Sequence, residues 1–272
     1  MLNRRAIDAH FLYARLEELF KPELCTDVFP KKGLQEDNAE KITKVYTATF
    51  ASPEVFENIL ARGETDVLLF THHPKPAMPS LKAGYGEIPG STLEELKKRR
   101  ISFFAYHIPM DMAGPYSTGT SLAKAMACEP YGSWYPQNGV HIGALCHSPY
   151  GNVDDLKHCL EATVGHRCEL YLYGDRELVN GRFAIMTGSA RSTDAYDWLT
   201  DLNINTFVLG VTAPTVDYTI AIHEAAKAKR INLIGGTHYS TEKFAPMAMC
   251  RWFRHMGLDA EFIPEQPHMD EI

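Results

Sequence analysis

Apolar residues along the chain alternate between the two-residue period of strands and the 3.6-residue period of helices. Strand patterns occur at 42–50, 66–70 and 101–106, and again near 140–146, 168–173, 182–187, 206–211 and 231–234. Helix patterns fill the intervals at 5–20, 53–62, 92–100, 121–127, Val153–Val164, Thr193–Asn203 and Asp217–Arg230. Because this alternation is typical of helices layered on parallel strands, we expect an α/β fold with mostly parallel sheets flanked by helices.

Local signals mark the ends of some of these elements. Pro53 suits the first turn of its helix, and Ser91 with Glu94 has the spacing of a capping box before the helix at 92–100. The stretch Pro130–Gly139 is rich in Pro and Gly, which is typical of a connection between compact parts. We therefore expect the join between two lobes in this stretch.

Composition narrows the class of protein. With 272 residues and 45% hydrophobic residues, the chain can bury a sizeable core. The net charge is −7 and no run of five basic residues occurs, which argues against a nucleic-acid partner. The most apolar windows, such as 66–70, are far shorter than the roughly 18 residues that span a bilayer. We expect no membrane association, a cytoplasmic location, and reduced thiols for the six scattered cysteines.

Common catalytic motifs are missing from the sequence. It has no G-x-x-x-x-G-K-[ST] loop, no G-x-G-x-x-G after the first strand, and no G-x-S-x-G elbow. These absences argue against P-loop nucleotide hydrolysis, Rossmann dinucleotide chemistry and the α/β-hydrolase mechanism.

Histidines and carboxylates instead follow the ends of three predicted strands. The segments are Thr71-His72-His73-Pro74, His107 to Asp111, and His238 to Glu242. Ligands bind outside the carboxyl ends of strands in open α/β sheets, so these segments point to one shared site. His238 and Glu242, four residues apart at the start of a predicted helix, share one face. Imidazoles and carboxylates without thiolates suit Zn²⁺, Fe²⁺ or Mn²⁺ and do not choose among them.

The three segments resemble the GTP cyclohydrolase 1 type 2 homologs, also called NIF-three-like proteins. The resemblance extends to Lys31–Gln35 and to Arg182–Ser189, and covers most of the chain. It implies two divalent metal ions per subunit, a two-lobed NIF-three-like fold and a ring-like homohexamer. It also implies a set of five metal ligands, namely His72, His73, Asp111, His238 and Glu242. His107 is then expected to orient a ligand or to donate a proton.

A shared site requires the C-terminal segment to return to the first part of the chain. We therefore expect one lobe from 1–127 and 231–272, enclosing a second lobe at 128–230. The expected function is metal-dependent hydrolysis of a small anionic or cyclic substrate. The alternative is a non-catalytic metal-binding protein with a regulatory or adaptor role. An open coordination position favours the enzyme, whereas ligation completed by the protein favours the alternative.

Overall fold

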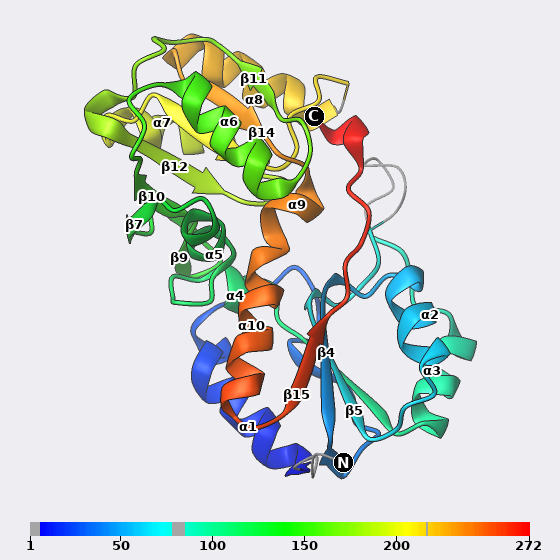
Figure 1. Cartoon of the computed structure of the whole chain (residues 1–272). Coiled ribbons are helices and arrows are strands. Elements are labelled where there is room, and N and C mark those ends of the chain that lie inside the picture. Colours follow the sequence, from blue (N-terminus) through cyan, green and yellow to red (C-terminus); the bar gives the residue numbers. More distant parts are fainter. Residues whose placement is uncertain (1–5, 78–84, 216) are drawn as a thin grey trace. The chain divides into compact units, whose positions relative to one another are not determined.

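The structure of the protein is a computed structural model that describes residues 6–77, 85–215 and 217–272 (Figure 1). The chain divides into two compact units, each assembled from two segments. Unit 1 comprises Met1–Met110 and Ala245–Glu265, and unit 2 comprises Asp111–Phe244 and Gln266–Ile272.

Unit 1 contains a five-stranded sheet in the order β15-β4-β5-β6-β2. The strands β15, β4, β5 and β6 are parallel, and β2 joins the edge in the antiparallel direction. The elements of unit 1 are β1 (Ile7–Asp8), α1 (Ala9–Phe20), η1 (Pro22–Leu24), β2 (Gly33–Glu36), β3 (Lys41–Ile42), β4 (Lys44–Phe50), α2 (Pro53–Ala61), β5 (Val67–His73), α3 (Gly90–Lys98), β6 (Ile101–Ala105), all but the first residue of α10 (Phe244–His255), and β15 (Asp259–Phe262).

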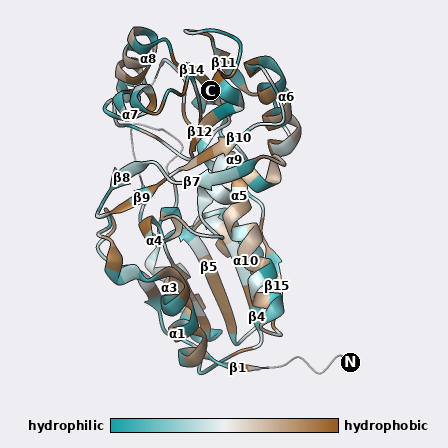
Figure 2. Cartoon of the chain, turned by 90° about the vertical axis from the view of Figure 1, so that its left-hand side faces the viewer, coloured by the Kyte–Doolittle hydropathy of each residue, from teal (hydrophilic) through white to brown (hydrophobic). Residues whose placement is uncertain are grey.

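Helices cover both faces of this sheet. On one face, Val55 and Ile59 of α2 pack with Leu96 of α3 in a buried cluster that includes Leu69 and Phe103. On the other face, α1 and α10 contribute aromatic rings, and Phe20 and Phe253 both contact Phe70 of β5. Figure 1 shows the two pairs of helices on opposite sides of β4 and β5. Because both faces are covered, β5 is apolar along most of its length, as its colour in Figure 2 shows.

Unit 2 contains a six-stranded sheet in the order β11-β14-β13-β12-β10-β7. Its central strands β12, β13 and β14 are parallel, whereas β11, β10 and β7 are antiparallel to their neighbours. The second sheet is therefore mixed rather than mostly parallel. The elements are α5 (Thr118–Ala125), β7 (Glu129–Gly132), β8 (Tyr135–Gln137), β9 (Val140–Ile142), β10 (Ala144–His147), α6 (Val153–Val164), β11 (Glu169–Tyr171), η2 (Val179–Gly181), β12 (Arg182–Met186), α7 (Ala195–Asp201), β13 (Thr206–Leu209), α8 (Asp217–Lys229), β14 (Asn232–Gly235), α9 (His238–Glu242) and η3 (Met269–Glu271).

Two hydrophobic clusters hold the helices of unit 2 on its sheet. Leu122 of α5 and Leu156 of α6 belong to one cluster, together with Phe183 of β12. Tyr196 of α7 and Ile222 of α8 belong to the other cluster, with further residues of the same strands. The sheet is thus covered on both faces, as in unit 1.

The two units differ from the predicted lobes in specific segments. Residues 111–127, 231–244 and 266–272 belong to unit 2. The physical reason is packing: α5 contacts β7 and β10, and β14 pairs with β13 inside the second sheet. The expected join at 130–139 contains β7 and β8 instead of a linker. Pro130 is tolerated there because β7 is an edge strand.

Two predicted helix starts also differ in the structure. The helix α3 begins at Gly90 with Pro89 as its N-cap and without a side-chain cap, so the capping box at Ser91 does not form. The helix α1 begins at Ala9, where the Asp8 side chain accepts a hydrogen bond from Phe11 N. The predicted first residue of that helix, Arg5, lies outside the described residues. Within the described ranges, no helix is both long and apolar enough to cross a membrane.

Candidate metal centre

Three histidines meet at the carboxyl ends of two neighbouring strands in unit 1. His72 and His73 are the last residues of β5, and His107 follows β6, which pairs with β5 in parallel. The ring of His107 lies 5.2 Å from that of His72 and 5.0 Å from that of His73, centroid to centroid. Each of the three offers a ligand atom within 4.8 Å of the other two. We call these three residues the histidine cluster.

Every ring of the histidine cluster is held through its Nδ1 atom. His72 Nδ1 lies 3.0 Å from the carbonyl oxygen of Tyr106, and His73 Nδ1 lies 3.1 Å from the hydroxyl of Tyr85. His107 Nδ1 lies 2.9 Å from Asp27 Oδ1. Metal-binding histidines commonly bind the ion through one nitrogen and a protein oxygen through the other. The Nε2 atom of each ring is therefore the candidate metal ligand.

Asp27 is a functional candidate that the sequence analysis missed. Its side chain is 2% exposed, and it also accepts hydrogen bonds from Phe29 N and Ile108 N. Burial alone would raise the pKa of this carboxyl, but the hydrogen bond and charge of His107 and the two amide donors outweigh it, and the pKa lies below its usual value. Asp27 and His107 are 80 positions apart, so no local pattern links them.

Unit 2 holds two further candidate metal ligands on the short helix α9. His238 Nε2 lies 3.2 Å from Glu242 Oε2, because residues four apart share a helix face. We call these two residues the α9 pair. The preceding residue, Thr237, has φ 64° and ψ 153°, a conformation that costs a residue other than glycine about 1–3 kcal/mol. Its hydroxyl caps the helix by accepting from Ser240 N.

The C-terminal segment fixes the start of α9. The carboxylate of Glu271 accepts a hydrogen bond of 2.6 Å from His238 N, and its carbonyl oxygen accepts from Thr212 N and Ala213 N. Burial raises the pKa of Glu271, although the charge and the amide of His238 act in the opposite direction. The last turn of the chain therefore holds the backbone at the first residue of the α9 pair.

Gly188 has no side chain, and the α9 pair occupies the space that a side chain at this position would need. It follows β12 with φ +70°, and a Cβ atom there would overlap Glu242 Oε1 and lie 3.0 Å from His238 Nε2. Its amide donates to Thr241 Oγ1 at 3.1 Å. The glycine is therefore required both by the backbone conformation and by the close approach of the pair.

Comparison with known proteins identifies the family of the chain. A family model described as Duf34/NIF3 (NGG1p interacting factor 3) matches residues 7–268. The chain belongs to the Duf34/NIF3 family. It is 23% identical over 261 residues to a GTP cyclohydrolase 1 type 2 homolog of Vibrio cholerae, an alignment that covers 93% of this chain and 96% of that protein.

Solved structures of similar proteins share the fold. Protein ybgI superimposes with a TM-score of 0.79 at 20% identity, covering 96% of this chain and 100% of that one. Reduced HcgD from Methanocaldococcus jannaschii superimposes with a TM-score of 0.74 at 18% identity, covering 96% and 99%. The family resemblance and the α/β fold class predicted from the sequence are confirmed.

The six residues predicted for the site divide between the two units of this Duf34/NIF3 protein. Unit 1 holds His72, His73 and His107, and unit 2 holds the α9 pair. Asp111, the last residue of α4 (Ile108–Asp111) and the first of unit 2, accepts a hydrogen bond of 2.6 Å from Thr118 Oγ1. Within unit 1 the histidine cluster offers imidazole nitrogens, and within unit 2 the α9 pair offers an imidazole nitrogen and a carboxylate oxygen. Donors of both kinds suit a divalent transition metal.

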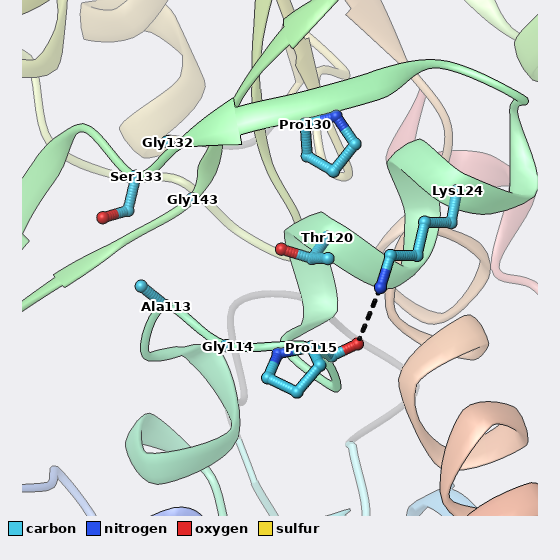
Figure 3. Close-up of a pocket in the computed structure, with 9 residues that line it drawn as sticks. All are labelled: Ala113, Gly114, Pro115, Thr120, Lys124, Pro130, Gly132, Ser133 and Gly143. Carbon is cyan, nitrogen blue, oxygen red and sulfur yellow. Dashed lines mark hydrogen bonds between the residues drawn. The ribbon is translucent and has the colours of Figure 1, made fainter.

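A small pocket opens in unit 2 beside the segment that follows Asp111 (Figure 3). Its volume is about 330 Å³, and its walls include Thr120, Lys124 and Ser133 among glycines and prolines. The ammonium group of Lys124 donates to the carbonyl oxygen of Pro115 at 3.3 Å, as the dashed line in Figure 3 shows. The pocket thus offers one positive charge and two hydroxyls to a small ligand.

Proposed function

We propose that this Duf34/NIF3 protein binds two divalent metal ions per subunit and hydrolyses a small anionic or cyclic substrate. The ligands are His72 and His73 of unit 1, with Asp111, His238 and Glu242 of unit 2. The observation that carries the proposal is the anchoring of the His72 and His73 rings through Nδ1, together with the His238–Glu242 contact. When bound, such ions lower the pKa of a water molecule and polarise the scissile group of the substrate.

The protein's own residues supply the remaining functions. The backbone of Tyr106 and the hydroxyl of Tyr85 hold the two imidazoles in position, while Phe50 stacks on the His73 ring at 4.4 Å between centroids. Asp111 and Glu242 contribute negative charge, which compensates the positive charge of the ions. Lys124 supplies a cationic side chain in the pocket of unit 2, which supports an anionic substrate.

The substitution Glu242→Gln tests the ligand assignment. It keeps the size of the side chain and removes its charge, so we expect the loss of at least one ion and of any hydrolytic activity, with the fold retained. Metal content of protein prepared without chelators, far-UV circular dichroism and a hydrolase substrate screen are the measurements. The matched control is Glu224→Gln, the same change at an exposed position of α8 in the same unit.

The outcomes separate the metal site from the chemistry. If Glu242→Gln binds two ions as tightly as the parent protein, the ligand assignment is wrong. If the parent saturates at one ion, the dinuclear proposal fails. If two ions bind and the screen finds no turnover, a regulatory or adaptor role replaces the hydrolase. The homohexamer is a further proposal, and a monomer at micromolar concentrations in light scattering would contradict it.

A further inference from the structure

We propose that His107 is a third imidazole ligand of the ion bound by unit 1, and that Asp27 is the positioning residue that aims it. The ion held by unit 1 then has three nitrogen donors, from His72, His73 and His107. The inference rests on the proposed function only in requiring that a divalent ion binds to these histidines.

The first support is that all three rings are anchored through the same atom, Nδ1. Each Nδ1 atom has an oxygen partner at 2.9–3.1 Å, and the three partners belong to three different residues. Each residue of the histidine cluster also offers a ligand atom within 4.8 Å of those of the other two. A cluster of three imidazoles is a common protein ligand set for Zn²⁺ that leaves a fourth position for water or substrate.

The second support is the environment of Asp27. Both carboxylate oxygens are occupied: Oδ1 by Phe29 N and His107, and Oδ2 by Ile108 N. An ionised carboxylate can only accept hydrogen bonds, so a His107 ring that carries a single proton must carry it on Nδ1. The lone pair is then on Nε2, the nitrogen that a metal ion requires. Asp27 thereby fixes both the tautomer and the rotation of the ring.

A purely structural role for Asp27 makes a different prediction. The bond to Ile108 N lies at the start of α4, so Asp27 could serve only to hold that turn. In that case neither the tautomer nor the rotation of the His107 ring would depend on Asp27. Unit 1 also contains an exposed pair, His10 and Asp37, whose nearest nitrogen and oxygen are 3.8 Å apart. Asp37 therefore provides a matched control for the removal of a carboxylate beside a histidine.

The test uses the full chain and the variants His107→Gln, Asp27→Asn and Asp37→Asn. Zn²⁺ affinity is measured by competition with a chromophoric chelator, and Co²⁺ replaces Zn²⁺ for visible absorption spectra. We expect Asp27→Asn to weaken binding of one ion by about 10- to 100-fold and His107→Gln to weaken it at least as much. We expect both variants to change the Co²⁺ spectrum. Asp37→Asn should remain within about twofold of the parent.

A measurement on the metal-free parent protein does not depend on how the variants fold. The ¹⁵N chemical shifts of the imidazole nitrogens report the tautomer, and we expect His107 to carry its proton on Nδ1. A ring protonated on Nε2 would overturn the positioning role of Asp27. A parent that binds two ions, with His107→Gln retaining the same affinity and Co²⁺ spectrum, would overturn the ligand role alone. A parent that binds no divalent ion would overturn the proposed function as well.

Discussion

Replacing Glu265 by Gln should change how the stability of unit 1 depends on pH. Glu265 follows β15, its residue is 8% exposed, and its Oε2 atom accepts from Thr49 N and Phe50 N, each at 3.1 Å. Burial raises the pKa of this carboxyl to about 7, although the Phe50 amide, the Ser52 hydroxyl and the Thr49 amide act in the opposite direction. Gln is always neutral and keeps a carbonyl oxygen for the two amides.

The sign and size of the expected change in stability with pH follow from the two protonation states of Glu265. In the unfolded chain the pKa is near 4.5, so between about pH 4.5 and 7 the folded protein binds the proton more tightly than the unfolded chain does. The stability contribution of the protonated form is complete below pH 4.5 and is lost as pH rises to 7. At about 1.4 kcal/mol per pH unit, the full effect is about 3 kcal/mol. Between pH 5 and pH 8, we expect the wild type to lose about 2.5 kcal/mol relative to Glu265→Gln.

Urea unfolding followed by far-UV circular dichroism at pH 5 and pH 8 measures this difference. Comparing the two proteins at each pH removes the contribution of all other titrating groups. The control is Glu57→Gln, the same substitution at an exposed position of α2 in the same unit. The contrary result is a difference in unfolding free energy between the wild type and Glu265→Gln that is the same at pH 5 and pH 8 to within about 0.5 kcal/mol. That result would show that burial does not hold this carboxyl neutral.

Two further substitutions test the α9 pair by changing residues that contact it, Gly188 and Glu271. An alanine at positive φ costs roughly 1 kcal/mol of unfolding free energy. Gly188→Ala should destabilise unit 2 by more than this amount, because the new Cβ atom would overlap Glu242. The control is Gly165→Ala, at φ +88°, where the new Cβ atom would lie in open space. Thermal unfolding and metal content are the measurements. Equal losses of stability for Gly188→Ala and Gly165→Ala would refute the prediction. Glu271→Ala removes the acceptor of His238 N and should cost about 1–3 kcal/mol in urea unfolding and weaken ion binding. Unchanged ion affinity would contradict the anchoring role.

Local patterns were sufficient to predict the elements that carry most of the proposed ligands. The apolar run at 66–70 predicted β5, because a strand covered on both faces is apolar, but the strand extends further and includes His72 and His73. A helix was expected to start at His238, and α9 begins there. Short, polar edge strands such as Asp259–Phe262 have no comparable signal, since their pairing with β4 is set by tertiary packing.

Contacts between distant residues could not be predicted in this way. The partner of His107 is 80 positions away, and the partner of the His238 amide is 33 positions away. Asp27 and Glu271 stand in segments without a periodic pattern, so their roles emerge only when the chain is folded. Gly188 was included in the family resemblance, but the resemblance alone did not reveal that its missing side chain makes room for Glu242.

Two buried carboxylates of unit 1 show how the fold assigns different roles to the same chemical group. Asp27 accepts two amide hydrogen bonds on separate oxygens and lies beside His107, so its pKa falls. Glu265 also accepts two amide hydrogen bonds, both on one oxygen, but burial outweighs them and its pKa rises. The decisive difference is the imidazole partner. Asp27 therefore remains ionised and can accept a hydrogen bond from His107 Nδ1, whereas Glu265 makes the stability of unit 1 depend on pH.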